Sequence, residues 1–264
     1  MIDCHAHLAS PRFDDDRAEV LSRAAAVGVE LVVVVGEDAS EAERVLEVCA
    51  AFPRMLRPCV GLHPDRWADD RTPPSQEDLE VVCDLARTHR DRLCAIGEVG
   101  LDWWAVRSHE RRALQRAALE RLAALAIELE LPLSVHARSA GRHAIETLAG
   151  VGARRVLMHA FDGRAGHALR AWEAHGWTFS IPPSVVRSKQ KQKLARALPL
   201  EALALESDSP ALGPERGERN EPANLVRSVE QIARHKRIDE ATVREVTTAN
   251  ARRLFGQAAA PLTG

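Results

Sequence analysis

Several features that would define a class of protein are scarce or missing in these 264 residues. The most apolar short run, at 31–35, is far below the roughly 20 residues that a membrane-spanning helix needs. The N-terminus has no basic start followed by an apolar run, so we expect neither a signal peptide nor a membrane partner. The net charge of −2 argues against a broadly basic nucleic-acid-binding face, but it allows a local basic patch.

Cysteine is used sparingly, and its pattern excludes a disulfide framework. The five cysteines are odd in number and form no C-x-x-C pair; they are Cys4, Cys49, Cys59, Cys83 and Cys94. This pattern is typical of reduced thiols that pack as small hydrophobic groups in a reducing compartment. We therefore expect a cytoplasmic protein.

Short apolar runs alternate with long amphipathic stretches along the chain. Several runs are rich in Val, Ile and Leu on both faces, as strands buried on both sides require. This alternation predicts a parallel sheet with right-handed crossovers. The strands are expected at 1–5, 30–36, 56–62, 93–98, 132–136, 155–160, 177–181 and 203–207.

Eight such units in a chain of this length predict an α/β fold of the (β/α)₈ TIM-barrel type. An open doubly wound sheet is the alternative, but neither a G-x-G-x-x-G nor a Walker A loop supports it. We expect one domain over 1–264, with a frayed tail after about 256. Within it, 109–130 is predicted to be helical, and Gly150, Gly152 and Gly176 are predicted to end helices.

Polar side chains that look out of place lie where the predicted strands end. His5 and His7 close the first strand and, being two residues apart, point to the same side. A single histidine at a strand end is more often a packing residue than a ligand. Because the C-terminal ends of barrel strands meet at one face, we instead expect a shared site. The other members are His63, Glu98, His136, His159 and Asp208.

Imidazoles and carboxylates in this combination are the ligands of divalent transition metals. Without a thiolate they favour Zn, Mn, Fe, Co or Ni, whereas a Mg site would normally use fewer histidines. Six protein ligands are too many for one catalytic metal with an open position. They suit two divalent metal ions about 3.5–4 Å apart that share a bridging carboxylate. The predicted ligands are His5, His7, Glu98, His136, His159 and Asp208.

At these residues the chain resembles the TatD family of metal-dependent deoxyribonucleases, within the amidohydrolase superfamily. The resemblance covers nearly the whole chain and is closest to the branch called TatD domain-containing protein three. It rests on DCHAHL (3–8), GLHP (61–64), GEVGLD (97–102), HARSAG (136–141), HAFDG (159–163), ESDSP (206–210) and RNEP (219–222).

The resemblance implies a division of the metal ligands. One metal would be held by His5, His7 and Asp208, and the second by His136 and His159. Glu98 would bridge the two metals.

Other residues near the predicted rim have open roles. Arg138 is placed to hold a phosphate oxygen or to make a surface ion pair. His63 is placed to contact a phosphate, to protonate a leaving group or to pack a loop. Asp102 would orient a ligand or cap the next segment, and 219–221 would order the loop after the eighth strand or contact substrate. The basic stretch 187–193, with Lys189, Lys191 and Lys193, would contact substrate or solvent.

Together these features predict hydrolysis of a DNA phosphodiester bond by a metal-activated water. Asp208 would align the water, while Glu98, His63 and Arg138 complete the catalytic set. DNA, single-stranded or at an end, is the expected substrate, and no obligate protein partner is expected. Two alternatives stay open. The first is an amidohydrolase-type enzyme acting on small phosphate esters or on C–N or C–O bonds, and the second is a non-enzymatic partner protein that kept the fold.

Overall fold

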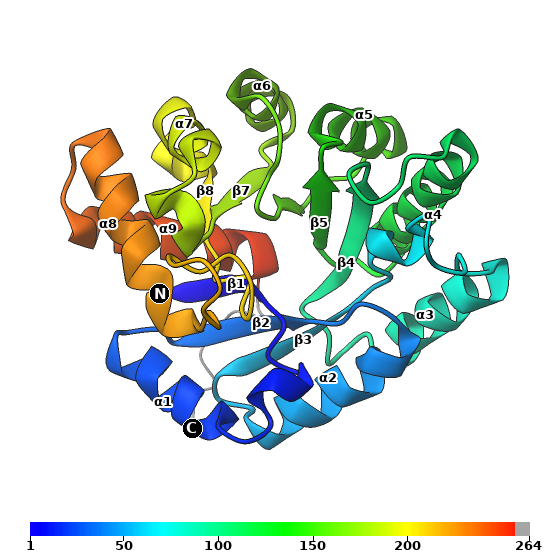
Figure 1. Cartoon of the computed structure of the whole chain (residues 1–264), viewed down its shortest axis with the longest axis horizontal. Coiled ribbons are helices and arrows are strands. Elements are labelled where there is room, and N and C mark those ends of the chain that lie inside the picture. The colour runs from blue at the N-terminus through cyan, green and yellow to red at the C-terminus, as the bar shows by residue number, and fades with distance from the viewer. Residues whose placement is uncertain (257–264) are drawn as a thin grey trace.

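The computed structural model describes residues 1–256, in which eight strands alternate with helices (Figure 1). The strands pair in sequence order, each parallel to the next, and form a nearly closed barrel. The predicted TIM-barrel fold is therefore confirmed. The strands are β1 (Ile2–Ala6), β2 (Leu31–Val35), β3 (Leu56–Val60), β4 (Ala95–Asp102), β5 (Leu133–Arg138), β6 (Val156–Met158), β7 (Thr178–Ile181) and β8 (Leu203–Leu205).

Helices surround the barrel in the same order, as Figure 1 shows. None of those in residues 1–256 is long and apolar enough to cross a membrane. In the described chain they are α1 (Arg17–Ala26), α2 (Ala39–Ala51), α3 (Gln76–Thr88), α4 (His109–Glu128), α5 (Gly141–Val151), α6 (Ala165–His175), α7 (Lys189–Ala197), α8 (Leu225–Lys236) and α9 (Glu240–Phe255).

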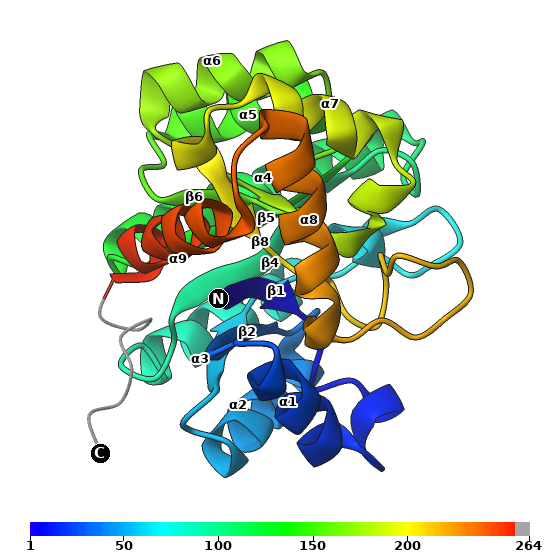
Figure 2. The same cartoon turned by 90° about the vertical axis from the view of Figure 1, so that its left-hand side faces the viewer.

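The apolar core has two layers because side chains along a strand alternate between the two faces of the sheet. The outer layer packs the strands against the surrounding helices. The inner layer fills the barrel and includes Ile2, Val33 and Cys59, together with Leu254 and Phe255 of α9. Figure 2 shows α9 at one end of the barrel and the long loops after β3 and β8 at the other. α9 thus covers part of the N-terminal end, and the C-terminal end is the one at which sites of this fold occur.

The five cysteines are all buried and free, as expected for reduced thiols that pack as small hydrophobic groups. Burial raises the pKa of Cys94 to about 12, so this thiol stays protonated at neutral pH. The inner layer contains Cys4, Cys59 and Cys94.

Two expectations about local structure were wrong. β4 does not end at Glu98 but pairs with β5 as far as Asp102. Glycine allows this close pairing, because a Cβ at Gly100 would overlap the carbonyl oxygen of His136. Gly150 does not end a helix but lies inside α5, whose C-cap is Gly152 with a φ of 79°. Gly176 caps α6 as expected, and the predicted frayed tail lies outside the described residues.

Candidate metal centre

The structure brings all seven predicted histidine and carboxylate groups to the C-terminal end of the barrel. A cavity of about 270 Å³ is lined by six of them, and His5 lies fully buried beside it. The lining groups are His7, His63, Glu98, His136, His159 and Asp208.

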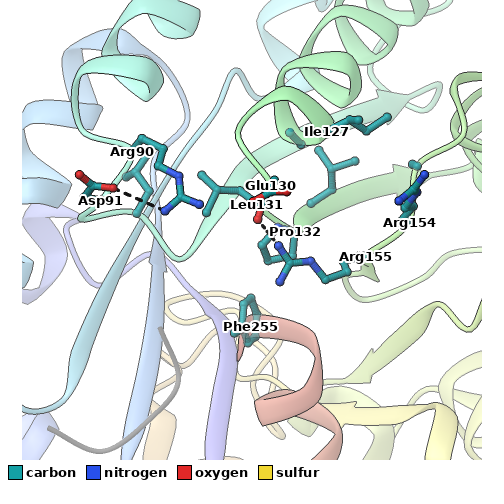
Figure 3. A pocket seen from close by; sticks show the side chains of 13 residues that line it. Arg90, Asp91, Ile127, Glu130, Leu131, Pro132, Arg154, Arg155 and Phe255 are labelled. Carbon is teal, nitrogen blue, oxygen red and sulfur yellow. Dashed lines mark hydrogen bonds and ion pairs between the residues drawn. The ribbon is translucent and has the colours of Figure 1, made fainter. Parts of the chain in front are cut away.

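A larger cavity, of about 850 Å³, lies at the opposite end of the barrel (Figure 3). It lies where β4, β5 and β6 begin and is lined by Phe255 of α9, by Arg154 and by Arg155. None of the predicted ligands reaches it. The predicted ligands therefore gather at the smaller cavity, at the end where active sites of this fold occur.

Glu98 is the centre of the cluster, and its two carboxylate oxygens face different histidines. The Nε2 atoms of His5 and His7 each lie 3.3 Å from Oε2. Around Oε1, His136 Nδ1 lies at 2.8 Å and His159 Nε2 at 3.3 Å. His63 Nε2 also lies 3.2 Å from Oε1. One buried carboxylate thus joins two sets of nitrogen donors.

Asp208 lies on the Oε2 side of Glu98, because backbone hydrogen bonds join the loop after β8 to β1. Its backbone N–H donates to the His5 carbonyl at 2.9 Å, and the N–H of His7 donates to the Ser209 carbonyl at 2.7 Å. Asp208 has a φ of 54°, a left-handed conformation that aspartate tolerates better than most residues. Its Oδ1 lies 3.5 Å from His7 Nε2 and 3.8 Å from His5 Nε2.

Three histidines are oriented by a hydrogen bond on the ring nitrogen that faces away from Glu98. His5 Nδ1 lies 2.9 Å from the hydroxyl of Ser134, and His136 Nε2 lies 3.2 Å from Asp102 Oδ2. His159 Nδ1 lies 2.9 Å from Glu206 Oε2. Such outer partners fix the rotation and tautomer of a metal-binding imidazole.

Sequence reasoning missed Glu206, which is fully buried. It also accepts hydrogen bonds from the hydroxyl of Ser180 and the backbone N–H of Ala160. The available signal was an acidic residue within the otherwise apolar stretch LALES, at 203–207.

The electrostatics of the cluster follow from buried carboxylates packed among imidazoles. Burial raises the pKa of Glu98, but the surrounding histidines, first among them His63, outweigh burial and hold this pKa well below its ordinary value. Burial lowers the pKa of His63, but the charge of Glu98 and the hydrogen bond that His63 donates to the Asp65 carboxylate raise it to about 10. The pKa of His159 is likewise well above its ordinary value, because Glu206 and Glu98 outweigh burial. Glu98 is therefore a charged carboxylate at neutral pH.

The donor set fits divalent metal ions. His5 Nε2 and Glu98 Oε2 are buried without a hydrogen-bond partner, a costly arrangement unless something else binds them. Donor atoms of His5, His7 and Asp208 lie within 4.8 Å of one another, as do those of His63, Glu98 and His136. Groups of imidazole and carboxylate at this spacing are typical of transition-metal sites.

Comparison with known proteins agrees with a donor set that fits divalent metal ions. Residues 2–256 match the family described as TatD related DNase. The human protein named deoxyribonuclease TATDN3 is 45% identical, over 97% of this chain and 94% of its own length. This chain belongs to the TatD family. The resemblance seen in the motifs and the expected class, a metal-dependent hydrolase, are confirmed.

Two more distant TatD proteins match over almost their whole length. A protein of Edwardsiella piscicida named 3'-5' ssDNA/RNA exonuclease TatD is 30% identical, over 97% of this chain and 99% of its own. The crystal structure of the TatD homologue YJJV from Escherichia coli K12 superposes with a TM-score of 0.86 at 25% identity, covering 97% of each chain.

The remaining rim residues of this TatD protein have distinct surroundings. The Arg138 guanidinium lies 3.7 Å from the ring centroid of Trp104, which is 59% exposed. Asp102 makes the contacts that both predicted roles need: Oδ2 lies 3.2 Å from His136 Nε2, and Oδ1 accepts the backbone N–H groups of Trp104 and Ala105. The hydrogen bonds from Asp102 thus fix the backbone at Trp104, the ring on which Arg138 stacks.

Two segments near the rim differ in what they contact. Arg219 pairs with Asp16 and Glu221 with Arg23, so RNEP orders its loop, as predicted. The expectation for Lys191, contact with either substrate or solvent, was wrong: this side chain is buried. Its Nζ donates to the backbone carbonyls of 160 and 161, because the turn of α7 on which it lies faces the core.

Proposed function

We propose that this TatD protein hydrolyses phosphodiester bonds in DNA, in single strands or at strand ends, with two divalent metal ions held on either side of Glu98. One observation carries the proposal: the two oxygens of Glu98 face two separate sets of donor atoms. A bridging carboxylate between two metals has this arrangement. A single metal would leave one of the two sets of buried donors without a partner.

The proposed division of ligands follows the two sides of Glu98. His5, His7 and Asp208 would hold one ion with Oε2, and His136 and His159 would hold the other with Oε1. Zn, Mn, Fe, Co and Ni suit this set, and Mg suits it less well because imidazoles dominate.

Bound metal ions would supply an activated water and neutralise charge on the phosphate. The chain's own groups would position the reactants. Asp208, ionised because His7 lowers its pKa against the effect of burial, would accept a hydrogen bond from the nucleophilic water. Asp65 holds Nδ1 of His63 at 2.9 Å, which leaves Nε2 to contact the phosphate or the leaving oxygen. Arg138 would hold a non-bridging oxygen from the rim.

Three observations support DNA as the substrate, and a single strand or a strand end as its form. The human relative is named a deoxyribonuclease, and the Edwardsiella relative is named for single-stranded DNA and RNA. In addition, a cavity of about 270 Å³ has room for a phosphate and its neighbours but not for a stiff duplex.

A substrate panel tests the proposal. Purified protein is stripped of metal, reloaded with each candidate ion, and assayed on single-stranded DNA, duplex DNA, RNA, a chromogenic phosphodiester, simple phosphate monoesters and amides. We expect release of nucleotides from single-stranded DNA that depends on the ion and is abolished in Asp208→Asn. Preference for an amide or a monoester over every phosphodiester would contradict the proposal.

A further inference from the structure

A second hollow of about 820 Å³ lies on the same face as the metal centre. Its walls are the loops after β5 and β6 together with the N-terminal parts of α5, α6 and α7. Two of these loops follow directly from the cluster: Ser139 comes three residues after His136, and Asp162 three residues after His159. We call this hollow the basic groove, lined by residues 139–143, 162–165, 167, 189, 190 and 193.

The charges of the basic groove are almost all positive and mostly unpaired. Arg164, Lys189 and Lys193 are exposed, and no carboxylate of residues 1–256 lies within ion-pair distance of them. Arg142 has only an exposed contact, 3.7 Å to Glu146. The acidic lining residue, Asp162, accepts the backbone N–H of Ser139. Unpaired cations gathered in a hollow create a local positive potential despite a net charge of −2.

Three helices begin at the basic groove and add to this potential. The N-caps of α5 and α6, Ala140 and Arg164, make no side-chain capping bond. The first turns of α5, α6 and α7 contain no acidic residue, whereas those of α1, α2, α3, α4 and α9 do. Free backbone N–H groups and the positive ends of the helix dipoles therefore favour an anion here.

The basic groove is also rigid, which favours binding because little order has to be imposed on its walls. Gln190 donates from its side chain to the carbonyls of Phe161 and Gly163, at 3.1 and 2.9 Å. Lys191, buried below, donates to the Phe161 carbonyl at 2.9 Å. These bonds tie α7 to the loop after β6.

We propose that the basic groove binds the backbone phosphates of a single-stranded DNA substrate whose scissile bond lies at the metal centre. Phosphates match the groove, since they offer repeated negative charge with no demand on base sequence. A flexible single strand can bend from the cavity into the groove, whereas a duplex is stiff over many turns. The inference rests on the proposed function, and it adds a binding site for the part of the DNA strand that extends beyond the scissile bond.

The test compares two charge-matched double variants by fluorescence anisotropy with a labelled single-stranded oligonucleotide over a range of salt concentrations. Lys189→Gln with Lys193→Gln removes two groove cations. Arg54→Gln with Arg154→Gln removes two cations from loops that precede β3 and β6, at the opposite end of the barrel. The chromogenic phosphodiester is assayed in parallel with both variants.

For the groove variant we expect the log–log salt slope to fall by about 1.4, at roughly 0.7 for each lost contact with a single strand. Its turnover of the chromogenic phosphodiester should stay at the parent level, which also shows that the centre is folded. The control variant should keep the parent slope. Arg164→Gln alone should lower the slope by about half as much as the groove variant.

An unchanged slope in the groove variant would overturn the inference, and so would an equal fall in the control, which would assign the effect to net charge. Failure of the proposed function looks different. In that case the oligonucleotide would bind with the expected groove dependence and remain uncleaved in the presence of every ion.

Discussion

At the residue scale, Glu98 and Asp208 carry the proposed chemistry. Glu98 is almost fully buried, and imidazoles lie 2.8–3.3 Å from its two oxygens. Asp208 contacts only one of the two histidine sets and borders the open cavity. Neutralising Glu98 should therefore affect mainly metal binding, whereas neutralising Asp208 should affect mainly kcat.

Glu98→Gln should weaken the binding of both metal ions, because one carboxylate serves both donor sets. His136→Ala removes a donor atom from one set and should mainly weaken the binding of one of the two ions. Metal content after dialysis against a graded chelator, measured by elemental analysis, distinguishes the two variants. If Glu98→Gln retains two tightly bound ions, Glu98 is not the bridge.

Asp208→Asn keeps the shape of the side chain but loses its charge and its capacity to accept a proton. We expect kcat on single-stranded DNA to fall by about 10²–10⁴-fold, as for the loss of a general base, with a much smaller change in KM. Kinetics at saturating metal measure this. Near-parental kcat under those conditions would show that Asp208 only packs against β1.

At the scale of elements, close pairing of β4 with β5 positions three site residues, Glu98, Asp102 and His136. Glycines make this approach possible, because a Cβ at Gly97 would lie 2.6 Å from the Ser134 carbonyl oxygen. Gly100 has a φ of 147° and the same constraint at the His136 carbonyl. Within GEVGLD, the glycines thus allow the close approach of the two strands, and Glu98 and Asp102 contact the histidines of the site.

Gly100→Ala should lower the free energy of unfolding by about 1–3 kcal/mol, since it forces a strained conformation against a neighbouring strand. Gly150→Ala is the matched control, because nothing lies within 4 Å of an added Cβ there. It lies within α5 and should gain roughly 0.5–1 kcal/mol. Denaturant unfolding compares both with the parent. Equal midpoints for parent and Gly100→Ala would show that β4 and β5 can move apart freely.

At the scale of the whole molecule, metal binding, protonation and stability are linked. In the chain itself the pKa values of His7, His63 and His159 lie above their ordinary value, because carboxylates outweigh burial. At pH values below the unfolded histidine pKa of about 6.5, these ion pairs make their full contribution to the stability of the metal-free fold. Their contribution is lost as pH rises through the folded values, which for His63 is about 10.

Metal ions must displace those protons, so their binding should strengthen as pH rises. We expect the metal-loaded protein to have a higher Tm than the chelated protein, with a larger difference at pH 8 than at pH 6. At an ion concentration of 100 times Kd the gain in unfolding free energy is about 2.7 kcal/mol. Calorimetry with two buffers of different ionisation enthalpy should show proton release at pH 7. Binding without proton release would contradict the assigned protonation.

The sequence by itself determined the barrel and the convergence of the site. Alternating apolar and amphipathic segments have a local physical cause, and parallel strands bring their C-terminal ends to one face. For this reason His5, His136 and His159 were predictable as neighbours before any contact was known. The hydrolase class and the family followed from motifs at those same strand ends.

Only the tertiary structure decided which atoms meet. The central place of Glu98, the support that Glu206 gives to His159 and the stacking of Arg138 on Trp104 depend on contacts between distant segments. Lys189 is exposed and Lys191 is buried because of how α7 is rotated against the core. Side chains two positions apart on a helix point in directions that differ by more than half a turn. Local patterns name the groups at a site, whereas packing sets their orientation, burial and charge.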